Sequence, residues 1–302
     1  DALIIQDLRL LEYNLPPIRL HASTQCDNRS PEQVMHLQKM GFQRVVLARE
    51  LSLKQIAEIH QKTIENQQPI ELEAFVHGSL CVSYSGRCYL SEVLMKRSAN
   101  RGECAQPCRQ RYDLLDKYGN EILDDHGKPI HQRYLLSLQD MDRSLHVAQM
   151  IEAGITTLKI EGRLKDKDYV TNIVAYYRQL IDQLKATHPH WTSTSTNSIY
   201  KYNFTPNPAK TFHRGATDYF LYGRNQQLTN WNTPKSTGEA IGKVVSVQGK
   251  AIRIQILPNI ILHNGDGLCY EDKGFAINRV EGDLLYTNQI IDIAPGTLLY
   301  RN

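Results

Sequence analysis

The fold of this chain is constrained most by a repeated unit, a short apolar segment followed by an amphipathic segment of helical periodicity. The apolar segments predict strands at 2–6, 18–25, 44–50, 70–78, 134–141 and 156–163. The amphipathic segments predict helices at 7–14, 32–41, 52–66, 144–154 and 167–186. Strands that alternate with helices indicate a parallel sheet in an α/β fold.

Two α/β architectures fit such an alternation, a closed barrel and a doubly wound sheet. The chain has no glycine-rich phosphate-binding loop after a strand, so the pattern favours a TIM-like (β/α) barrel. The first strand begins at Ala2 with no preceding turn or helix cap. Only about six of the eight barrel strands are recognisable, and we therefore expect a barrel that is incomplete at its N-terminal side.

The character of the sequence changes twice after this region, which predicts three parts: 1–186, 187–234 and 235–302. Residues 187–234 are rich in Ser, Thr, Asn and Pro and are expected to connect two domains. The basic and aromatic residues of this segment suit either stacking on nucleotides or a strap packed over the barrel. Residues 235–302 contain short alternating strands separated by Gly, Asn and Asp, which predicts a small antiparallel β-barrel.

The composition argues against a membrane protein. No apolar run approaches the roughly 18 residues that a spanning helix needs, and no secretory signal pattern stands at the start. The expected location is the cytoplasm, where clustered cysteines are metal ligands or catalytic groups more often than disulfides. The formal net charge of +3 is too small to indicate a nucleic-acid partner by itself.

Four of the six cysteines lie close together, at Cys81, Cys88, Cys104 and Cys108. A structural zinc site usually has two pairs of cysteines with two to four residues between the members, and only Cys104 and Cys108 have near that spacing. Irregular spacing with Ser, Gly and Arg nearby suits an iron–sulfur cluster held by loops. A zinc site and unligated thiols remain the alternatives.

Several predicted strands end in polar residues at alternating positions, which is unusual for the interior of a barrel. Active sites of such barrels lie at the carboxyl ends of the strands. The catalytic candidates are Glu73, His77, Lys159, Glu161 and Arg163, and His21, Ser23 and Gln25 follow the same pattern. The carboxylate and imidazole suit acid–base catalysis, and the cations suit a carboxylate or phosphate. An internal ion network is the alternative interpretation.

Cations concentrate around the cysteines. Arg97, Arg101, Arg109 and Arg111 all lie in this region and are the candidates for contacts with RNA phosphates.

Several blocks of the sequence resemble one family. Residues 73–91 resemble the signature of the collagenase-like U-type peptidases, the thirty-second family of peptidases of unknown mechanism, and residues 21–25, 45–52, 97–109 and 159–170 resemble its further blocks. Within the family, the likeness is greatest to the bacterial branch that makes 5-hydroxycytidine in large-subunit ribosomal RNA. The branch that makes 5-hydroxyuridine in tRNA is its near relative.

The resemblance implies an RNA-modifying enzyme with a TIM-like barrel and a [4Fe–4S] cluster on Cys81, Cys88, Cys104 and Cys108. It implies hydroxylation of C5 of a pyrimidine in ribosomal RNA, with prephenate involved in the pathway. Three alternatives stay open: a collagenase-like peptidase, a tRNA uridine hydroxylase, and a non-catalytic RNA-binding protein with a structural metal. For the peptidase, the sequence has no H-E-x-x-H motif.

Overall fold

The computed structural model describes residues 1–67, 69–191, 202–224, 227–270 and 273–301. The chain divides into two compact units, one of residues 1–161 and 216–229 and one of residues 162–215 and 230–302. Residues 192–201 and 225–226 of the predicted connecting segment lie outside the described residues. The three-part division at residues 186 and 234 stays a prediction.

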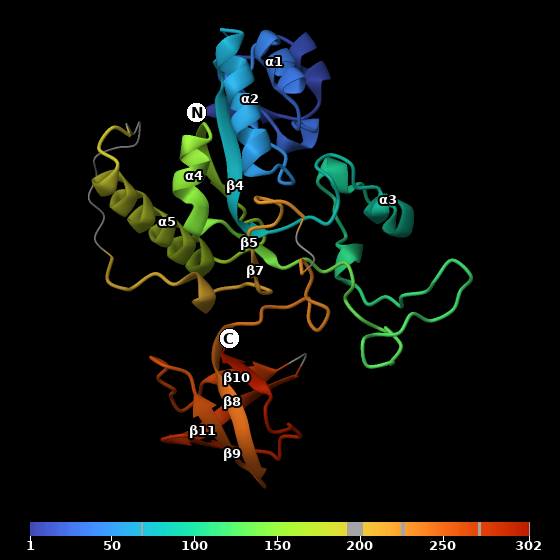
Figure 1. Ribbon diagram of the computed structural model, residues 1–302, viewed down its shortest axis with the longest axis vertical. Coiled ribbons are helices and arrows are strands. Elements are labelled where there is room, and N and C mark those ends of the chain that lie inside the picture. Colours follow the sequence, from blue (N-terminus) through green and yellow to red (C-terminus); the bar gives the residue numbers. More distant parts are fainter. Residues whose placement is uncertain (68, 192–201, 225–226, 271–272, 302) are drawn as a thin grey trace. The chain divides into compact units, whose positions relative to one another are not determined.

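A mixed sheet forms the centre of the first unit (Figure 1). Its strands are β1 (Ala2–Ile5), β2 (Arg19–Ala22), β3 (Arg44–Val46), β4 (Glu71–Ser79), β5 (Asp140–Asp142), β6 (Ile155–Ile160) and β7 (Ala216–Thr217). They are ordered β1-β2-β3-β4-β5-β7, and β6 pairs with β4. The pairs β1–β2, β2–β3, β3–β4 and β4–β6 are parallel, as the alternation of strands and helices predicts.

The helices of this unit begin at clear sequence signals. Helix α1 (Pro31–Lys39) is capped by Ser30, and α2 (Leu53–Glu65) begins with a capping box between Ser52 and Gln55. Helices α3 (Leu90–Met95) and α4 (Val147–Glu152) are shorter. The helix predicted at 7–14 is instead a short 3₁₀ turn over Leu8–Glu12, none of whose residues is buried.

The core of the first unit lies between the sheet and its helices. Val34 and Leu37 of α1, and Ile56 and Ile59 of α2, are at most 1% exposed. Burying each such side chain contributes about 1.5–3 kcal/mol, which is the main force that holds these helices to the sheet.

The TIM-like barrel is not confirmed by this sheet. Among the described strands of the first unit the sheet is open, and β5 runs antiparallel to the end of β4. A closed parallel barrel needs a crossover connection before every strand. Between β4 and β5 the chain instead runs through the cysteine segment and an irregular loop, so β5 returns in the opposite direction.

The second unit contains the long helix α5 (Lys167–Thr187), which Asp166 caps, and a closed antiparallel barrel. The barrel strands are β8 (Glu239–Gln248), β9 (Ala251–Ile256), β10 (Gly267–Tyr270), β11 (Lys273–Glu281), β12 (Leu284–Thr287) and β13 (Leu298–Arg301). Their order is β10-β11-β12-β9-β8-β13, and β13 pairs with β10 to close the barrel. The prediction of a small antiparallel β-barrel is confirmed.

None of the described helices combines the length and apolarity that crossing a membrane requires.

A close contact between the backbones of β4 and the end of β6 allows a test of this fold. Gly78 has a φ of +108°, and a Cβ atom there would lie 2.3 Å from the carbonyl oxygen of Glu161. We expect Gly78→Ala to lower the free energy of unfolding by about 3 kcal/mol, because backbone strain and overlap add. The midpoint of urea unfolding measures this.

Gly119→Ala is the matched control, since Gly119 has a φ of +88° and nothing within 4 Å of its Cβ position. Backbone strain alone predicts a loss of about 1–2 kcal/mol there. Equal midpoints for the two variants would contradict the close contact between Gly78 and Glu161.

Candidate functional site

The sheet register brings charged residues of different strands onto one face. His21 of β2 pairs with Arg44 of β3, which pairs with Glu71 of β4. Residues at matched positions of neighbouring strands point to the same face, and alternate residues of one strand do so too. Glu71 and Glu73 are therefore on the same face as Arg44.

These charges form a continuous chain of ion pairs. Arg19 Nη2 lies 2.7 Å from Glu71 Oε1, and Arg44 Nη2 lies 2.6 Å from Glu71 Oε2. Arg44 Nη1 reaches Glu73 Oε2 at 3.4 Å, and Lys159 Nζ lies 3.0 Å from Glu73 Oε1. Glu73 is only 6% exposed, so its charge needs these two cations as compensation. Burial would raise the pKa of Glu71, but hydrogen bonds from Arg19 and Arg44 lower it.

A histidine–aspartate pair lies further along β4. His77 is 6% exposed, and its Nδ1 lies 3.9 Å from Asp142 Oδ1 at the end of β5. Burial would raise the pKa of Asp142, yet hydrogen bonding from the His77 ring and the Ser144 amide lowers it to about 2. This carboxylate therefore stays ionised and can orient the imidazole.

Two cations lie over the ring of Phe75, which stands between Glu73 and His77 on β4. The Arg49 guanidinium is 4.2 Å from the ring centre, and Lys159 Nζ is 5.4 Å from it. Arg49 also approaches Glu161, with Nη2 4.0 Å from Oε2. The structure thus places Glu73, His77, Lys159 and Glu161 along β4 and β6. Arg163 belongs to the second unit and is not placed relative to them.

The four clustered cysteines lie on loops that follow β4. Cys81, Cys88 and Cys108 are partly buried and Cys104 is exposed. Burial raises the pKa of Cys81 and of Cys108, and the neighbouring thiolates raise both further, those of Cys88 and Cys104 in each case. The four thiols therefore lie within electrostatic range of one another. Such a group favours a bound cation or cationic cluster, which would offset the repulsion between thiolates.

Among the described residues, no three His, Cys, Asp or Glu side chains are placed to hold a single metal ion.

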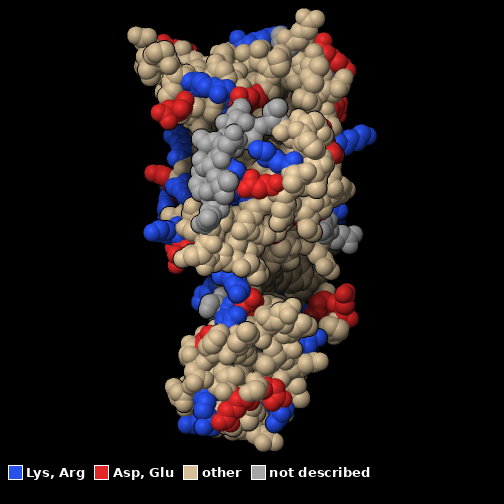
Figure 2. Space-filling model, turned by 90° about the vertical axis from the view of Figure 1, so that its left-hand side faces the viewer, with Lys and Arg blue, Asp and Glu red and all other residues tan. Residues whose placement is uncertain are grey.

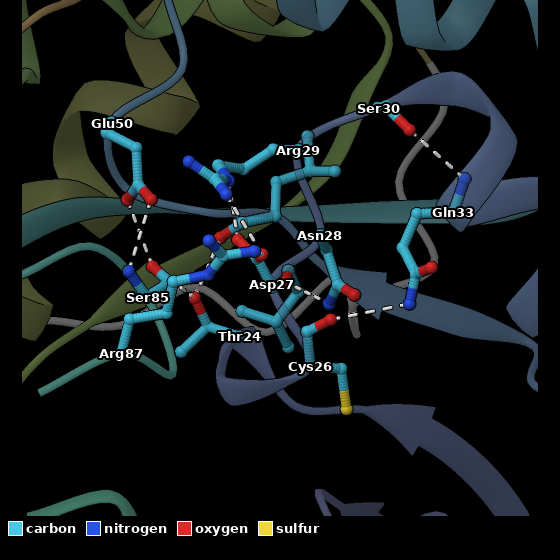
Figure 3. A network of polar contacts seen from close by, with 12 residues as sticks. Thr24, Cys26, Asp27, Asn28, Arg29, Ser30, Gln33, Glu50, Ser85 and Arg87 are labelled. Carbon is cyan, nitrogen blue, oxygen red and sulfur yellow. Dashed lines mark hydrogen bonds and ion pairs between the residues drawn. The ribbon is translucent and has the colours of Figure 1, made fainter.

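The first cysteine loop is anchored to the ends of β2 and β3 (Figure 3). Ser85 donates from its backbone N–H to Glu50 Oε1 at 3.1 Å and from its hydroxyl to Glu50 Oε2 at 3.0 Å. Thr24 donates to the Ser85 hydroxyl at 3.3 Å, and Arg87 pairs with Asp27. Gly86 packs so closely that a Cβ atom would lie 2.3 Å from the carbonyl oxygen of Gln25. These contacts fix the backbone between Cys81 and Cys88.

Arg109 anchors the second cysteine pair. Its guanidinium donates to the Ser137 hydroxyl at 2.9 Å and to the carbonyl oxygens of Leu138 at 2.7 Å and Leu80 at 2.9 Å. Since Leu80 precedes Cys81 and Arg109 follows Cys108, the side chain ties together the two ends of the cysteine segment.

The other arginines predicted to contact RNA are exposed. Arg97 and Arg101 lie near α3, and Arg111 lies over the ring of Tyr134 at 5.2 Å. On the face drawn in Figure 2, Lys and Arg side chains are interspersed with Asp and Glu. The RNA-binding role of the four arginines stays a prediction, and Arg109 has the structural role described above.

Sequence reasoning missed several residues of this site. Arg44, Arg49 and Glu71 were not recognised, although Arg44 begins one predicted strand and Glu71 is the second residue of another. Glu50 ends the strand predicted at 44–50, just before a predicted helix; Ser52 caps that helix, and Glu50 holds the cysteine loop. Arg143 was also missed: it is 1% exposed and donates to the carbonyl oxygens of Arg49, Phe75 and Asp218.

Comparison with known proteins gives several matches. The model of peptidase family U32 matches residues 1–231. The 23S rRNA 5-hydroxycytidine C2501 synthase of Escherichia coli K12 is 42% identical over 93% of this chain and 41% of its own length. The tRNA hydroxylation protein P1 of Bacillus subtilis is 31% identical over 88% of this chain and 60% of its own length.

The collagenase of Porphyromonas gingivalis is also similar, 30% identical over 82% of this chain and 58% of its own length. The chain thus spans between about two fifths and three fifths of the length of these relatives. No solved structure matches it.

The His77–Asp142 pair predicts a pH dependence. The pKa of Asp142 is about 2 in the fold against 3.8 for a free side chain, so its contribution is present above pH 3.8 and is lost as pH falls toward 2. We expect Asp142→Asn to lower the free energy of unfolding at neutral pH by about 2 kcal/mol. Urea unfolding at several pH values should show this deficit shrinking between about pH 4 and pH 2.

Asp125→Asn is the control, because Asp125 lies on an exposed loop. A deficit for Asp142→Asn that does not change with pH would show that the variant acts through packing instead of charge.

Proposed function

The chain belongs to peptidase family U32, and from this membership and the site geometry we propose that it hydroxylates C5 of a cytidine in large-subunit ribosomal RNA with the help of a [4Fe–4S] cluster. The proposal rests on one observation: four thiols are grouped beside the ends of the strands that carry a buried histidine and two carboxylates paired with cations. The names of the similar proteins, an rRNA 5-hydroxycytidine synthase and a tRNA hydroxylation protein, favour RNA as the substrate.

The cluster would be held by Cys81, Cys88, Cys104 and Cys108. Iron–sulfur clusters are commonly bound by four cysteine thiolates from loops, and they spread their ligands further apart than one metal ion does. The neighbouring thiolates add to the burial that raises the pKa of Cys81 and Cys108, which is consistent with this, and the guanidiniums of Arg49 and Arg109 respectively oppose the rise only in part. Zinc on the same thiols is the alternative metal.

The reaction replaces C5–H by C5–OH, which is an oxidation. With water as the source of the oxygen atom, the reaction releases two electrons and two protons. Protein side chains do not accept electrons from a pyrimidine, so a bound iron–sulfur cluster would pass them, one at a time, to an external electron acceptor. The chain's own residues would handle the proton and the orientation of the ring. His77, beside the ionised Asp142, is the candidate to take up the proton that leaves C5.

The remaining charges would position anionic groups. Glu73 holds Lys159, and Arg49 holds Glu161, so these side chains enter the site in fixed orientations. We assign to Lys159 the binding of an RNA phosphate or of a carboxylate such as that of prephenate. The role of Arg163 in binding such an anion stays a prediction. Arg97, Arg101 and Arg111 would contact the RNA backbone outside the site. The proposed location is the cytoplasm.

A collagenase-like peptidase is the second candidate, because one similar protein is named a collagenase. The pair of His77 and Asp142 resembles part of a hydrolase triad, but no nucleophile is assigned that would complete the triad. Cleavage of gelatin by the pure chain that is lost in His77→Ala would favour this candidate.

The main proposal predicts a phenotype in RNA. A strain without this protein should lack 5-hydroxycytidine in large-subunit ribosomal RNA, and the intact gene should restore it, as measured by mass spectrometry of RNA digests. Cys104→Ala should fail to restore it because one cluster ligand is lost. The anaerobically purified intact protein should contain iron and sulfide, and Cys104→Ala should contain much less.

Cys269→Ala is the matched control, since Cys269 lies in strand β10 of the small barrel and outside the cysteine group. It should retain both the iron and the RNA modification. Normal 5-hydroxycytidine in the strain without the protein would refute the assignment, and zinc in place of iron in the purified protein would refute the cluster.

A further inference from the structure

A polar pocket of about 510 Å³ opens beside the cysteine loop of the first unit. Pockets of this size commonly bind small molecules or single groups of a larger ligand. Its lining includes Arg29, Glu50, Tyr84, Phe220 and Arg224. They come from four separate segments of the chain, so only the folded unit assembles the pocket.

Two guanidiniums and two aromatic rings face this pocket together. Arg29 lies over the ring of Tyr84 at 5.1 Å, and Arg224 lies over the ring of Phe220 at 5.1 Å. Arg224 Nη2 also donates to the Tyr84 hydroxyl at 3.1 Å. Each aromatic ring is therefore paired with a cation, which is the combination that proteins use to stack a base and hold a phosphate.

The charge balance of the pocket favours an anion. Glu50 is the one carboxylate among the described lining residues, and Ser85 donates two hydrogen bonds to it. Asp27 pairs with Arg29 from outside the lining, but it is also paired with Arg87 (Figure 3). Counted together with Asp27 and Arg87, three guanidiniums stand against two carboxylates, a net charge of +1, and Glu50 is already hydrogen-bonded.

The backbone of the pocket is strained where the aromatic residues enter it. Tyr219, next to Phe220, has a φ of +59°, a left-handed conformation that costs a residue with a side chain of order 1–3 kcal/mol. The Tyr219 and Phe220 rings stack at 4.0 Å, and the Leu53 N–H donates to the Leu221 carbonyl oxygen at 2.8 Å. These contacts hold the strained turn in place and fix the direction of Phe220.

The pocket adjoins the cysteine group. Tyr84 and Ser85 lie between Cys81 and Cys88 in the sequence, and Ser85 is the residue that Glu50 holds. Burial, together with negative charges on Glu50, Cys81 and Tyr84, raises the pKa of the Tyr219 hydroxyl to about 12. Tyr219 is therefore close to both the pocket and the first cysteine.

We propose that this pocket binds one nucleotide of the RNA substrate, with the base packed against Tyr84 and a phosphate held by Arg29 and Arg224. The inference rests on the proposed RNA modification and names the part of the molecule that recognises the strand. Such a nucleotide has to be unstacked from its neighbours, as is usual for enzymes that act on a base. The position beside the cysteine loop would hold the strand next to the cluster.

Binding of cytidine 5′-monophosphate to the full chain tests the pocket, measured by isothermal titration calorimetry. We expect binding to the intact chain that weakens about tenfold in Arg224→Gln, because a charge-assisted hydrogen bond to the phosphate is lost. Tyr84→Leu should weaken it by a similar factor, because stacking on the base is lost. Cytidine without the phosphate should bind about tenfold more weakly to the intact chain.

The matched control is Arg9→Gln, since Arg9 is an exposed arginine that pairs with Asp7 and lies outside the pocket lining. It should bind the nucleotide as the intact chain does. Three results would overturn the proposal: no binding of the nucleotide to the intact chain, unchanged affinity in Arg224→Gln, or inorganic phosphate binding as tightly as the nucleotide with no effect of Tyr84→Leu. The last result would identify a simple anion site.

Formation of 5-hydroxycytidine is measured separately and distinguishes the two proposals. If the chain binds the nucleotide as expected but a strain without the protein keeps 5-hydroxycytidine in its ribosomal RNA, the proposed reaction is refuted and the pocket is supported. Loss of hydroxylation in Cys104→Ala, with normal hydroxylation and nucleotide affinity in Arg224→Gln, would support the reaction and refute the pocket.

Discussion

The first unit depends on the guanidinium of Arg143, which is buried where the regular sheet ends. It donates to the carbonyl oxygens of Arg49, Phe75 and Asp218, which lie on three segments far apart in the sequence. A buried charge is costly unless it is fully hydrogen-bonded, and these backbone acceptors meet that need. The same bonds satisfy backbone carbonyl groups of these three segments. Arg143 thus connects the loop after β3, the centre of β4 and the segment that carries Phe220.

The cysteine segment is held in a similar way, by side chains that bond to backbone. Glu50 accepts two hydrogen bonds from Ser85, and Arg109 donates three across the base of the segment. Loops have few apolar contacts, so their position relative to a sheet has to come from such polar contacts. The result is that four thiols on irregular backbone lie close enough to influence one another. A preorganised group of this kind is what a cluster needs if it is to bind without large rearrangement.

The charged side chains on one face of β4 and β6 form a network of ion pairs. Glu73 is buried between Arg44 and Lys159, and each charge of that set is compensated by a neighbour from another strand. Removal of one partner would leave a buried charge uncompensated, which is far more costly than loss of a surface pair. Both interpretations of these residues therefore have a physical basis: an internal ion network is present, and it also orients Lys159 and leaves His77 beside an ionised carboxylate.

The sequence by itself determined the alternation of strands and helices, the cysteine group, the small antiparallel barrel and the family, because these depend on local periodicity, spacing and turn residues. Only the tertiary structure decided the antiparallel return of β5 and the open sheet, since strand direction after an irregular loop is set by pairing and not by local pattern. It alone also revealed the contacts of Arg143, Glu50, Arg29 and Arg224. Their partners are distant in the chain, and a charged side chain gives no sign in the sequence of whether it meets solvent, a carboxylate or a backbone carbonyl.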